Sequence, residues 1–317
     1  MRLVGTAALL LSAGLVAPAT VDPGAPLSEW AVMARLAPES LLLDVARSGE
    51  RLLAVGERGH ILVSSDGGSS WTQAKVPTRA LLTGVYLHDS QLGWAVGHDA
   101  VVLRTRDGGV SWERVHYAPE HERPLLDVWF KDKERGLATS AYGELLATSD
   151  GGDSWQSRPI RDGDDFHLNQ IAAAADGALY IAGEAGHLYR SDDSGATWLA
   201  LPSPYAGSFF GLLPLSEGPV LAFGLRGRLF SSADRGRSWT AIETGTEATL
   251  LCGLQIAPGR FVVAGMEGTL VWRDSLTSPV RTEQRPDRQA IVALAPNPGH
   301  GLLLFGEGGV RHLELPR

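Results

Sequence analysis

The sequence of 317 residues contains a single cysteine, Cys252. An intramolecular disulfide is therefore excluded, and an apolar core rather than covalent cross-links must hold the fold together. A chain of this length buries enough apolar surface on folding to do so.

Positive charge is also scarce, because the formal net charge at pH 7 is -8. Nucleic-acid-binding proteins normally display a strongly basic surface, so this charge argues against that function class. Lysine occurs only at Lys75, Lys131 and Lys133, and arginine supplies the rest of the basic charge. The planar arginine side chain suits carboxylate recognition, although a GC-rich genome produces the same bias.

Long apolar runs are absent beyond the N-terminus, where residues 3–16 are mostly apolar and Ala17-Pro18-Ala19 follows. This pattern is typical of a secretory signal peptide, and the run is shorter than the about 20 residues that span a bilayer. We expect a signal peptide at residues 1–19 and a short linker at 20–27, with retention as an anchor as the alternative. The protein is then expected outside the cytoplasm, peripheral to the membrane.

An eight-residue motif, in contrast, is abundant. Residues 64–71 read SSDGGSSW, and close copies occur at 105–112, 148–155, 191–198 and 232–239. The tryptophans that end these copies, at positions 71, 112, 155, 198 and 239, are 41, 43, 43 and 41 residues apart. That period is typical of four-stranded β-propeller blades.

Each repeat also contains short apolar segments separated by glycine-rich turns, as strands in such blades require. The turn after the second segment recurs seven times, at Gly56, Gly97, Ser140, Gly183, Gly224, Gly265 and Gly306. The sequence therefore predicts an all-β fold: one seven-bladed β-propeller of four-stranded antiparallel blades over residues 28–317. The blades are expected at approximately 41–77, 81–120, 125–160, 168–204, 209–245, 250–286 and 291–317.

The last two repeats are incomplete. The sixth retains only Asp274 of the motif, and the seventh ends after three expected strands. Residues 28–38 resemble the fourth strand of the first repeat, and Trp30 lies 41 residues before Trp71. We expect this N-terminal strand to complete the seventh blade and close the ring, which would remove two exposed sheet edges.

The repeated motif is predicted to be structural. Asp and Ser side chains hydrogen-bond backbone N–H groups in turns, and the closing Trp fills the space between neighbouring sheets. Five near-identical copies argue against catalysis, because an active site on a ring is one asymmetric constellation. The expected structural residues are Asp66, Asp107, Asp150, Asp193, Asp234, Trp30, Trp71, Trp112, Trp155, Trp198 and Trp239.

Binding is expected on the opposite face, which is built from the turns between second and third strands and from the connections between blades. Irregular loops on a rigid ring are where binding residues usually lie. The arginines there either form a patch for an acidic protein segment or are scattered solubilising charge. The candidates are Arg58, Arg79, Tyr117, Arg123, Tyr142, Arg161, Tyr205, Arg226, Arg228 and Arg285.

Metal sites have weak support in the sequence. Residues 161–167 gather carboxylates around a glycine but lack the closing Glu of an EF-hand loop. His116, His121 and His167 lack the short spacing typical of zinc ligands. We therefore expect neither a metal nor another cofactor.

Residues 59–71 and 143–155 resemble the Asp-box, or bacterial neuraminidase, repeat. Seven such units behind a signal peptide resemble the photosystem II stability and assembly factor family of propellers. The resemblance implies a non-enzymatic, monomeric protein that binds subunits of an envelope or photosynthetic membrane complex. It would act in the periplasm, or in the thylakoid lumen of a phototroph.

A glycan-binding or sialidase-like propeller is the alternative, since sialidases share the Asp box. Sialidases also need an arginine triad, a Tyr paired with a Glu, and an acidic acid/base residue. The Phe/Tyr-Arg-Ile-Pro-like segment that usually carries the first arginine is absent, while Tyr86, Tyr117, Tyr142 and Tyr205 remain as nucleophile candidates. A calcium-bearing, integrin-like adhesion module is a third alternative.

Overall fold

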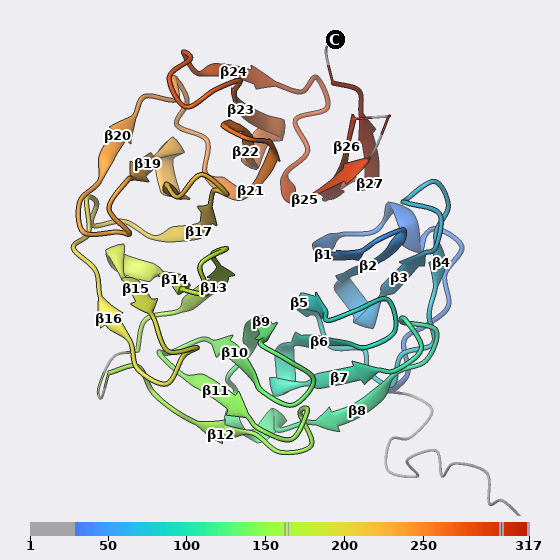
Figure 1. Ribbon diagram of the computed structural model, residues 1–317. Coiled ribbons are helices and arrows are strands. Elements are labelled where there is room, and N and C mark those ends of the chain that lie inside the picture. The colour runs from blue at the N-terminus through green and yellow to red at the C-terminus, as the bar shows by residue number, and fades with distance from the viewer. Residues whose placement is uncertain (1–28, 162, 164, 298, 300, 316–317) are drawn as a thin grey trace, which may run out of the picture.

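The chain forms a ring of seven β-sheets arranged around a central axis, which confirms the predicted seven-bladed β-propeller (Figure 1). The computed structural model describes residues 29–161, 163, 165–297, 299 and 301–315, so the expected signal peptide and linker lie outside the described residues. Six of the sheets have four antiparallel strands, which follow one another from the centre of the ring to its perimeter.

The strands of the first four blades follow the repeats. Blade one comprises β1 (Leu42–Ser48), β2 (Arg51–Gly56), β3 (Ile61–Ser64) and β4 (Thr72–Gln73). Blade two comprises β5 (Leu82–Leu87), β6 (Gly93–Gly97), β7 (Val102–Thr105) and β8 (Glu113–His116). Blade three comprises β9 (Leu125–Phe130), β10 (Gly136–Ser140), β11 (Leu145–Thr148) and β12 (Gln156–Ser157). Blade four comprises β13 (Leu168–Ala173), β14 (Leu179–Gly183), β15 (Leu188–Ser191) and β16 (Leu199–Ala200).

The remaining strands form three further blades. Blade five comprises β17 (Phe209–Pro214), β18 (Val220–Gly224), β19 (Leu229–Ser232) and β20 (Thr240–Ile242). Blade six comprises β21 (Leu250–Ala257), β22 (Arg260–Gly265), β23 (Thr269–Arg273) and β24 (Arg281–Gln284). Blade seven comprises β25 (Ile291–Asn297), β26 (Gly301–Gly306) and β27 (Gly309–Leu313).

The helices of the described residues are single 3-10 turns. Five of them connect the second and third strands of a blade: η3 (Glu57–Gly59), η4 (His98–Ala100), η6 (Glu184–Gly186), η7 (Leu225–Gly227) and η8 (Met266–Gly268). The other two, η2 (Ala37–Glu39) and η5 (Pro119–His121), lie between blades. Among the described residues, no helix is long and apolar enough to cross a bilayer.

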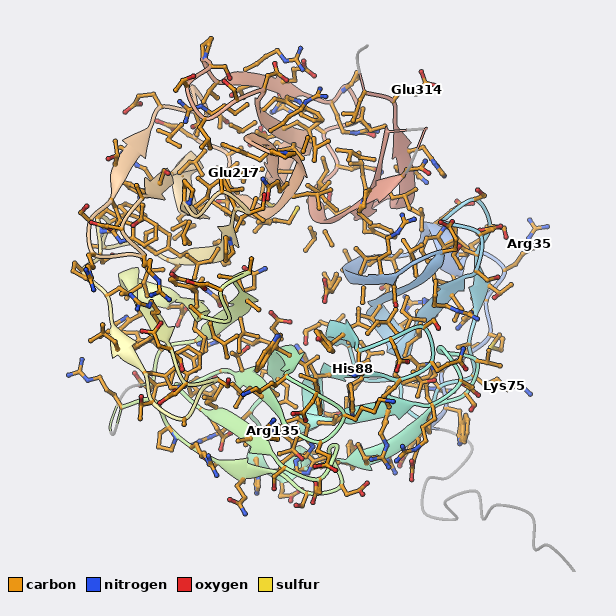
Figure 2. All side chains as sticks on the ribbon, viewed as in Figure 1. Arg35, Lys75, His88, Arg135, Glu217 and Glu314 are labelled. Atoms are coloured by element: carbon orange, nitrogen blue, oxygen red, sulfur yellow. The ribbon has the colours of Figure 1, made fainter. Side chains whose placement is uncertain are left out.

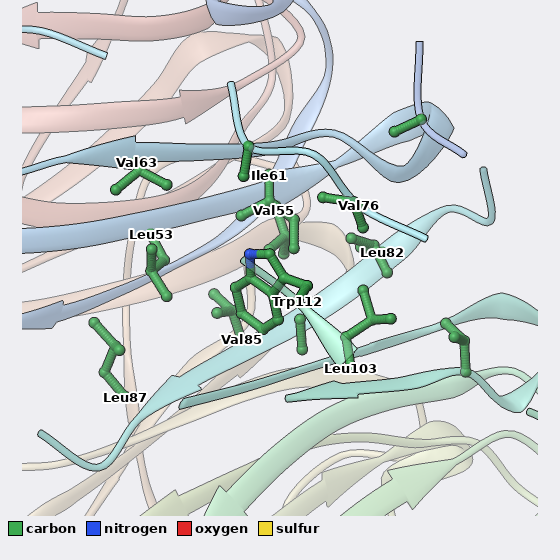
Figure 3. Packing of buried hydrophobic residues seen from close by; sticks show 14 residues of the cluster. Leu53, Val55, Ile61, Val63, Val76, Leu82, Val85, Leu87, Leu103 and Trp112 are labelled. Atoms are coloured by element: carbon green, nitrogen blue, oxygen red, sulfur yellow. The ribbon is translucent and has the colours of Figure 1, made fainter. Parts of the chain in front are cut away.

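The core consists of apolar layers between neighbouring blades. The second strand of each blade is buried on both faces, as in β2, whose residues 52–56 are all buried. In the layer between blades one and two, Trp112 packs among Leu53, Val63, Val85 and Leu103 (Figure 3). Burial of side chains in these layers supplies the stability that a chain without disulfides requires.

The N-terminal segment does not complete blade seven, and this expectation was wrong. Among the described residues blade seven has three strands, and residues 29–36 run beside the outer strand of blade one. The Ala31 N–H donates to the Val76 carbonyl at 2.9 Å, and the amide group of Gln73 bonds both the Val32 carbonyl and the Ala34 N–H. These bonds, together with burial of Ala31 in the layer between blades one and two, hold the segment away from β27.

Side-chain packing closes the ring instead. Leu52 and Leu62 of blade one share one apolar cluster with Leu303 and Phe305 of blade seven. Trp71 packs edge-on against Phe305, with ring centroids 5.7 Å apart. An edge-to-face aromatic contact adds to the area that the layer buries, so blades one and seven are held without a shared strand.

The two faces of the ring carry different loops, as the sequence predicted. On one face the Asp-box loops bond the hairpin turns between first and second strands, as in Gly67 N–H to Glu50 C=O at 3.1 Å. On the other face the turns between second and third strands bond the connections between blades, as in Ala118 N–H to Asp99 C=O at 3.1 Å. We call this second surface the turn face.

Candidate functional site

The carboxylate of each Asp box is occupied by its own turn. In blade three, the Thr148 hydroxyl donates to Asp150 Oδ1 at 2.8 Å, and the Ser154 N–H donates to the same oxygen at 2.9 Å. The Gly152 N–H donates to Thr148 Oγ1 at 3.0 Å. Donation from the Ser154 hydroxyl and N–H, and then from Thr148, lowers the pKa of Asp150 to about 2. The same bonds recur around Asp66, Asp107, Asp193 and Asp234.

The tryptophans that close the boxes lie between blades, with differences among copies. The indole N–H of Trp71, Trp112 and Trp155 donates to a glycine carbonyl within its own box. The indole of Trp239 donates instead to the Pro202 carbonyl at 3.0 Å, and the buried N–H of Trp198 has no acceptor among the described residues. Trp30 lies outside any box, and its carbonyl accepts from Arg79 Nε at 2.9 Å.

The turn face presents side chains of several chemical kinds at equivalent positions of six blades. The middle residue of six turns has a left-handed backbone with φ between 50° and 60°: Arg58, Asp99, Tyr142, Ala185, Arg226 and Glu267. This conformation is costly for a residue other than glycine and is held by the surrounding turn. The ring therefore displays basic, acidic, aromatic and small groups at equivalent positions, and the turn face is chemically asymmetric.

Most of the candidate arginines on the turn face have partners. Arg123 lies 3.7 Å from Glu144, Arg285 lies 2.6 Å from Asp287, and Arg58 lies 3.8 Å from its neighbour Glu57. Arg79 is bound to the Trp30 carbonyl, and Arg161 is exposed. These arginines are spread over blades one, two, three and six, so they do not form one patch.

The three candidate tyrosines occupy different surroundings. Tyr117 lies under the Arg114 guanidinium at 4.4 Å, and Tyr142 packs edge-on against His167 with centroids 5.1 Å apart. Tyr205 packs against Phe209 and Phe230, and the Arg228 guanidinium lies 5.8 Å from its ring. Only Tyr205 therefore lies beside candidate arginines without a carboxylate partner among the described residues.

Blade five carries a cationic hollow on the turn face. Arg226 and Arg228 line a pocket of about 370 Å³ together with Glu243, Thr244 and Glu247. Both arginines lie at the surface of η7, and neither forms an ion pair with another described residue. The fold thus brings Arg226 and Arg228 together in the lining of one hollow, which is large enough for a peptide side chain or chain terminus, and Tyr205 lies beside Arg228.

Two acidic residues that the sequence reasoning missed line the central channel, a cavity of about 500 Å³ bounded by the innermost strands. Asp44 Oδ2 accepts from the Val85 N–H at 2.8 Å, and Asp127 Oδ2 accepts from the Ile171 N–H at 3.0 Å. Each carboxylate therefore ties its blade to the next. Burial raises the pKa of both groups, and the charge of Asp127 raises that of Asp44 further. The sequence Leu-Leu-Asp-Val occurs at both 42–45 and 125–128, and this repeat is the signal by which the two residues could have been found.

No constellation for glycoside hydrolysis is assembled by the described residues. Tyr86 is packed against Phe130, and none of Tyr86, Tyr117, Tyr142 and Tyr205 bonds a carboxylate through its hydroxyl within that part of the chain. A sialidase needs a tyrosine paired with a glutamate and a separate acid.

The candidate metal loops also remain without an assembled ligand set. Asp162 and Asp164 of the acidic loop lie outside the described residues. Across residues 29–315, apart from the undescribed positions, no three His, Cys, Asp or Glu side chains gather as metal ligands. His167 pairs with Glu184 at 3.0 Å and is not grouped with His116 or His121.

Comparison with known proteins points to one family. The family described as "Photosynthesis system II assembly factor YCF48" matches residues 23–124 and 118–273. The chain is 33% identical over 120 residues to photosystem II stability/assembly factor HCF136 of Arabidopsis thaliana, covering 35% of this chain and 29% of that protein. It is 33% identical over 167 residues to photosystem II assembly protein Ycf48 of Synechococcus sp., covering 48% of this chain and 46% of the relative.

A solved structure of a related protein has the same fold. The structure described as "YCF48 bound to D1 peptide" superposes with a TM-score of 0.73 at 15% identity, over 90% of this chain and 97% of that one. Identity this low establishes the fold alone. The matched segments span less than half the length of the two curated relatives.

Proposed function

Because the chain belongs to the photosystem II assembly factor family described by YCF48, we propose that it binds protein subunits of a membrane complex during their assembly. In this proposal the propeller is a non-catalytic scaffold, and the blade-five pocket holds an acidic segment or the carboxyl terminus of a partner. The relatives are named assembly factors, and one was solved with a D1 peptide bound.

The observation that carries the proposal is the pair Arg226 and Arg228, which line a pocket without ion-pair partners among the described residues. A guanidinium donates two parallel hydrogen bonds to a carboxylate, which gives both strength and orientation. Tyr205 adds a partly buried aromatic surface beside Arg228. Glu243 and Glu247 also line the pocket and repel negative charge. The carboxylate of the occupant should therefore lie at the two arginines rather than elsewhere in the pocket.

The test replaces both arginines with glutamine and measures binding of a D1 peptide by calorimetry. Loss of charge-assisted hydrogen bonds is expected to weaken binding by about tenfold or more. Arg237→Gln is the matched control, since this exposed arginine lies in the Asp box of the same blade on the opposite face. Two outcomes would contradict a binding pocket on the turn face: the control Arg237→Gln weakens peptide binding as much as the double variant does, or the double variant does not weaken it.

We further propose that the protein is a monomer peripheral to the membrane in the periplasm, or in the thylakoid lumen if the organism is a phototroph. The support is the signal-peptide pattern of residues 1–19. N-terminal sequencing of the protein from an extracytoplasmic fraction is expected to begin near Thr20, and light scattering to give one chain per particle. Recovery with the cytoplasmic fraction would count against this location.

A purified chain that hydrolysed fluorogenic sialosides would overturn the non-catalytic assignment. No activity is expected, because the carboxylates of the Asp boxes are held in their turns and no tyrosine–carboxylate pair is formed by the described residues.

A further inference from the structure

Within the residues that the structure describes, the outer edge of blade seven is unpaired. The other blades each have a fourth strand outside the third: β4, β8, β12, β16, β20 and β24. In blade seven, β27 is the outermost strand, and Figure 1 shows it at the perimeter of the ring. Within the described residues, β26 is the only segment whose backbone hydrogen-bonds β27. An unpaired edge of this kind offers N–H and C=O groups to an extended segment of another protein.

The layer beneath this edge is also incomplete. Between blades one and two, Gly109 of the blade-two Asp box lies against Leu53 and Val63. Trp272 stands seven residues after Gly265, as Val63 stands seven residues after Gly56, so it faces the place where blade seven would carry its own box. The described residues that follow β27, Glu314 and Leu315, contain no such box.

Trp272 has an unsatisfied hydrogen-bond donor at this layer. Its side chain is 3% exposed, and its indole N–H has no hydrogen-bond acceptor among the described residues. At the layer between blades two and three, Trp94 donates its indole N–H to Gly151 of the neighbouring Asp box at 2.9 Å. A buried donor without an acceptor is unfavourable, so a segment that brought a carbonyl to Trp272 would be stabilised there.

The described parts of this chain are poorly placed to fill the position themselves. Residues 29–36 are bonded to blade one, and Glu29 forms an ion pair at 3.1 Å with Arg114 on β8, two blades away from β27. At the inner end of the slot, Pro38 and Glu39 already lie against Gly309, just as Thr78 and Arg79 lie against Gly59.

The residues of β27 define the chemistry of the occupant. Arg311 and His312 follow each other in the strand, so they point to opposite faces of the sheet, and neither forms an ion pair with another described residue. Leu313 and Leu315 pack against the cluster that contains Trp272, and both remain partly exposed. Cross-strand neighbours of opposite charge stabilise a sheet, and an apolar side chain would cover the Trp272 layer.

We propose that the outer edge of β27 binds an extended segment of a partner protein, with acidic and apolar residues, as the fourth strand of blade seven. This surface is separate from the blade-five pocket and does not depend on it. Glu314, which follows β27, lies at the perimeter of the ring (Figure 2), at the position where Ser64 opens the Asp box that precedes the fourth strand of blade one.

The first test fills the slot with the protein's own repeat. Residues 64–77 are grafted after Leu313 in place of residues 314–317, because Ser64 and Glu314 occupy equivalent positions and the Ser64 hydroxyl is part of the Asp box. The full-length graft is expected to raise the melting temperature by about 2 °C or more. A Gly/Ser tail of equal length in the same place is the control and should give no rise, because it likewise removes Leu315 but supplies no strand. An unchanged melting temperature in the graft would show that the slot is already filled.

The second test uses a labelled peptide that copies residues 69–77 with glutamate replacing Gln73 and Lys75. It is expected to bind the unmodified chain saturably in fluorescence anisotropy and to bind the graft at least about tenfold more weakly. The same peptide with alternate backbone nitrogens methylated is expected not to bind, because strand pairing needs those N–H groups. The variant carrying Arg226→Gln and Arg228→Gln should bind the peptide like the unmodified chain. Equal binding to the chain and the graft would overturn the proposal.

The third test asks whether residues 29–36 reach β27 in solution. Cysteines at positions 31 and 76 should form a disulfide under mild oxidation, because the backbone N–H of Ala31 lies 2.9 Å from the Val76 carbonyl oxygen and the two main chains therefore run side by side. Cysteines at positions 33 and 312 should remain reduced. Efficient cross-linking of the second pair would assign the slot to the chain's own N-terminal segment and end the partner hypothesis.

Discussion

At the scale of single residues, the hydroxyl that opens each Asp box has two roles. Thr148 Oγ1 accepts from the buried Gly152 N–H and donates to Asp150, and Ser64, Ser191 and Ser232 do the same in other blades. The Asp150 carboxylate in turn accepts a hydrogen bond from the Ser154 N–H. A buried amide is satisfied in each repeat by a side chain four residues earlier in the sequence.

Replacing Thr148 with valine is expected to lower the free energy of unfolding by about 1–3 kcal/mol, because the shape is kept while the Gly152 N–H loses its acceptor. Denaturant unfolding followed by fluorescence would measure the change. Thr148→Ser should cost much less, since serine occupies this position in three other boxes. A larger loss for serine than for valine would show that the methyl group, rather than the hydroxyl, matters.

At the scale of elements, the turns between second and third strands determine what the turn face displays. Each such turn packs tightly against the connection between blades. Gly59 has φ +72°, and a Cβ at this position would collide with the Thr78 carbonyl oxygen. Glycine is required there both by the left-handed backbone and by the close approach of the connecting chain.

The variants Gly59→Ala and Gly49→Ala separate these two causes. Gly49 has φ +62°, but a Cβ added there would meet no atom of the described residues within 4 Å, so alanine should cost only about 1 kcal/mol for the backbone conformation. Alanine at Gly59 is expected to cost about 1–3 kcal/mol more, because the connecting chain must shift. Thermal unfolding of both variants would measure the difference. Equal costs would mean that the connection yields freely.

At the scale of the whole molecule, carboxylates at the centre of the ring link blades that are otherwise joined by apolar layers. Asp44 and Asp127 each accept an N–H from the following blade. Burial raises the pKa of both, so the folded protein retains protons that the unfolded chain releases above about pH 4. These two groups therefore stabilise the fold most at acidic pH, and that stabilisation is lost as the pH rises toward and beyond neutrality.

The double variant Asp44→Asn and Asp127→Asn is expected to gain stability relative to the unmodified protein as the pH rises from about 5 to about 8. The relative gain should be on the order of 1 kcal/mol or more. The free energy of unfolding of the variant minus that of the unmodified protein is taken at each pH, so the contributions of the other titrating groups cancel. Asp132→Asn is the control, because hydrogen bonds from the Arg135 side chain and N–H lower the Asp132 pKa to about 2, outside the range. A difference that stays constant with pH would argue against raised pKa values in the channel.

Much of the ring could be predicted because its repeats are local. The spacing of the Asp boxes matched the blade period, and the glycine turns matched the number of blades, since each turn is satisfied by residues close in sequence. The face that carries each loop followed from strand order. The sequence predicted that all ten candidate binding residues lie on one face. It did not show which of the arginines lack an ion-pair partner.

The sequence by itself determined the propeller, its seven blades and the turn that closes each Asp box, because hydrogen bonds within eight residues do not depend on distant parts of the chain. Only the tertiary structure decided where residues 29–36 lie, since blade one and β27 compete for the same segment and Gln73 and Val76 bind it on blade one. It also decided which arginines of the described residues remain unpaired and that Asp44 and Asp127 meet the next blade. Those outcomes depend on groups about 40 residues apart in the sequence, which is one blade period. Such groups come close only when the blades have folded and packed against one another.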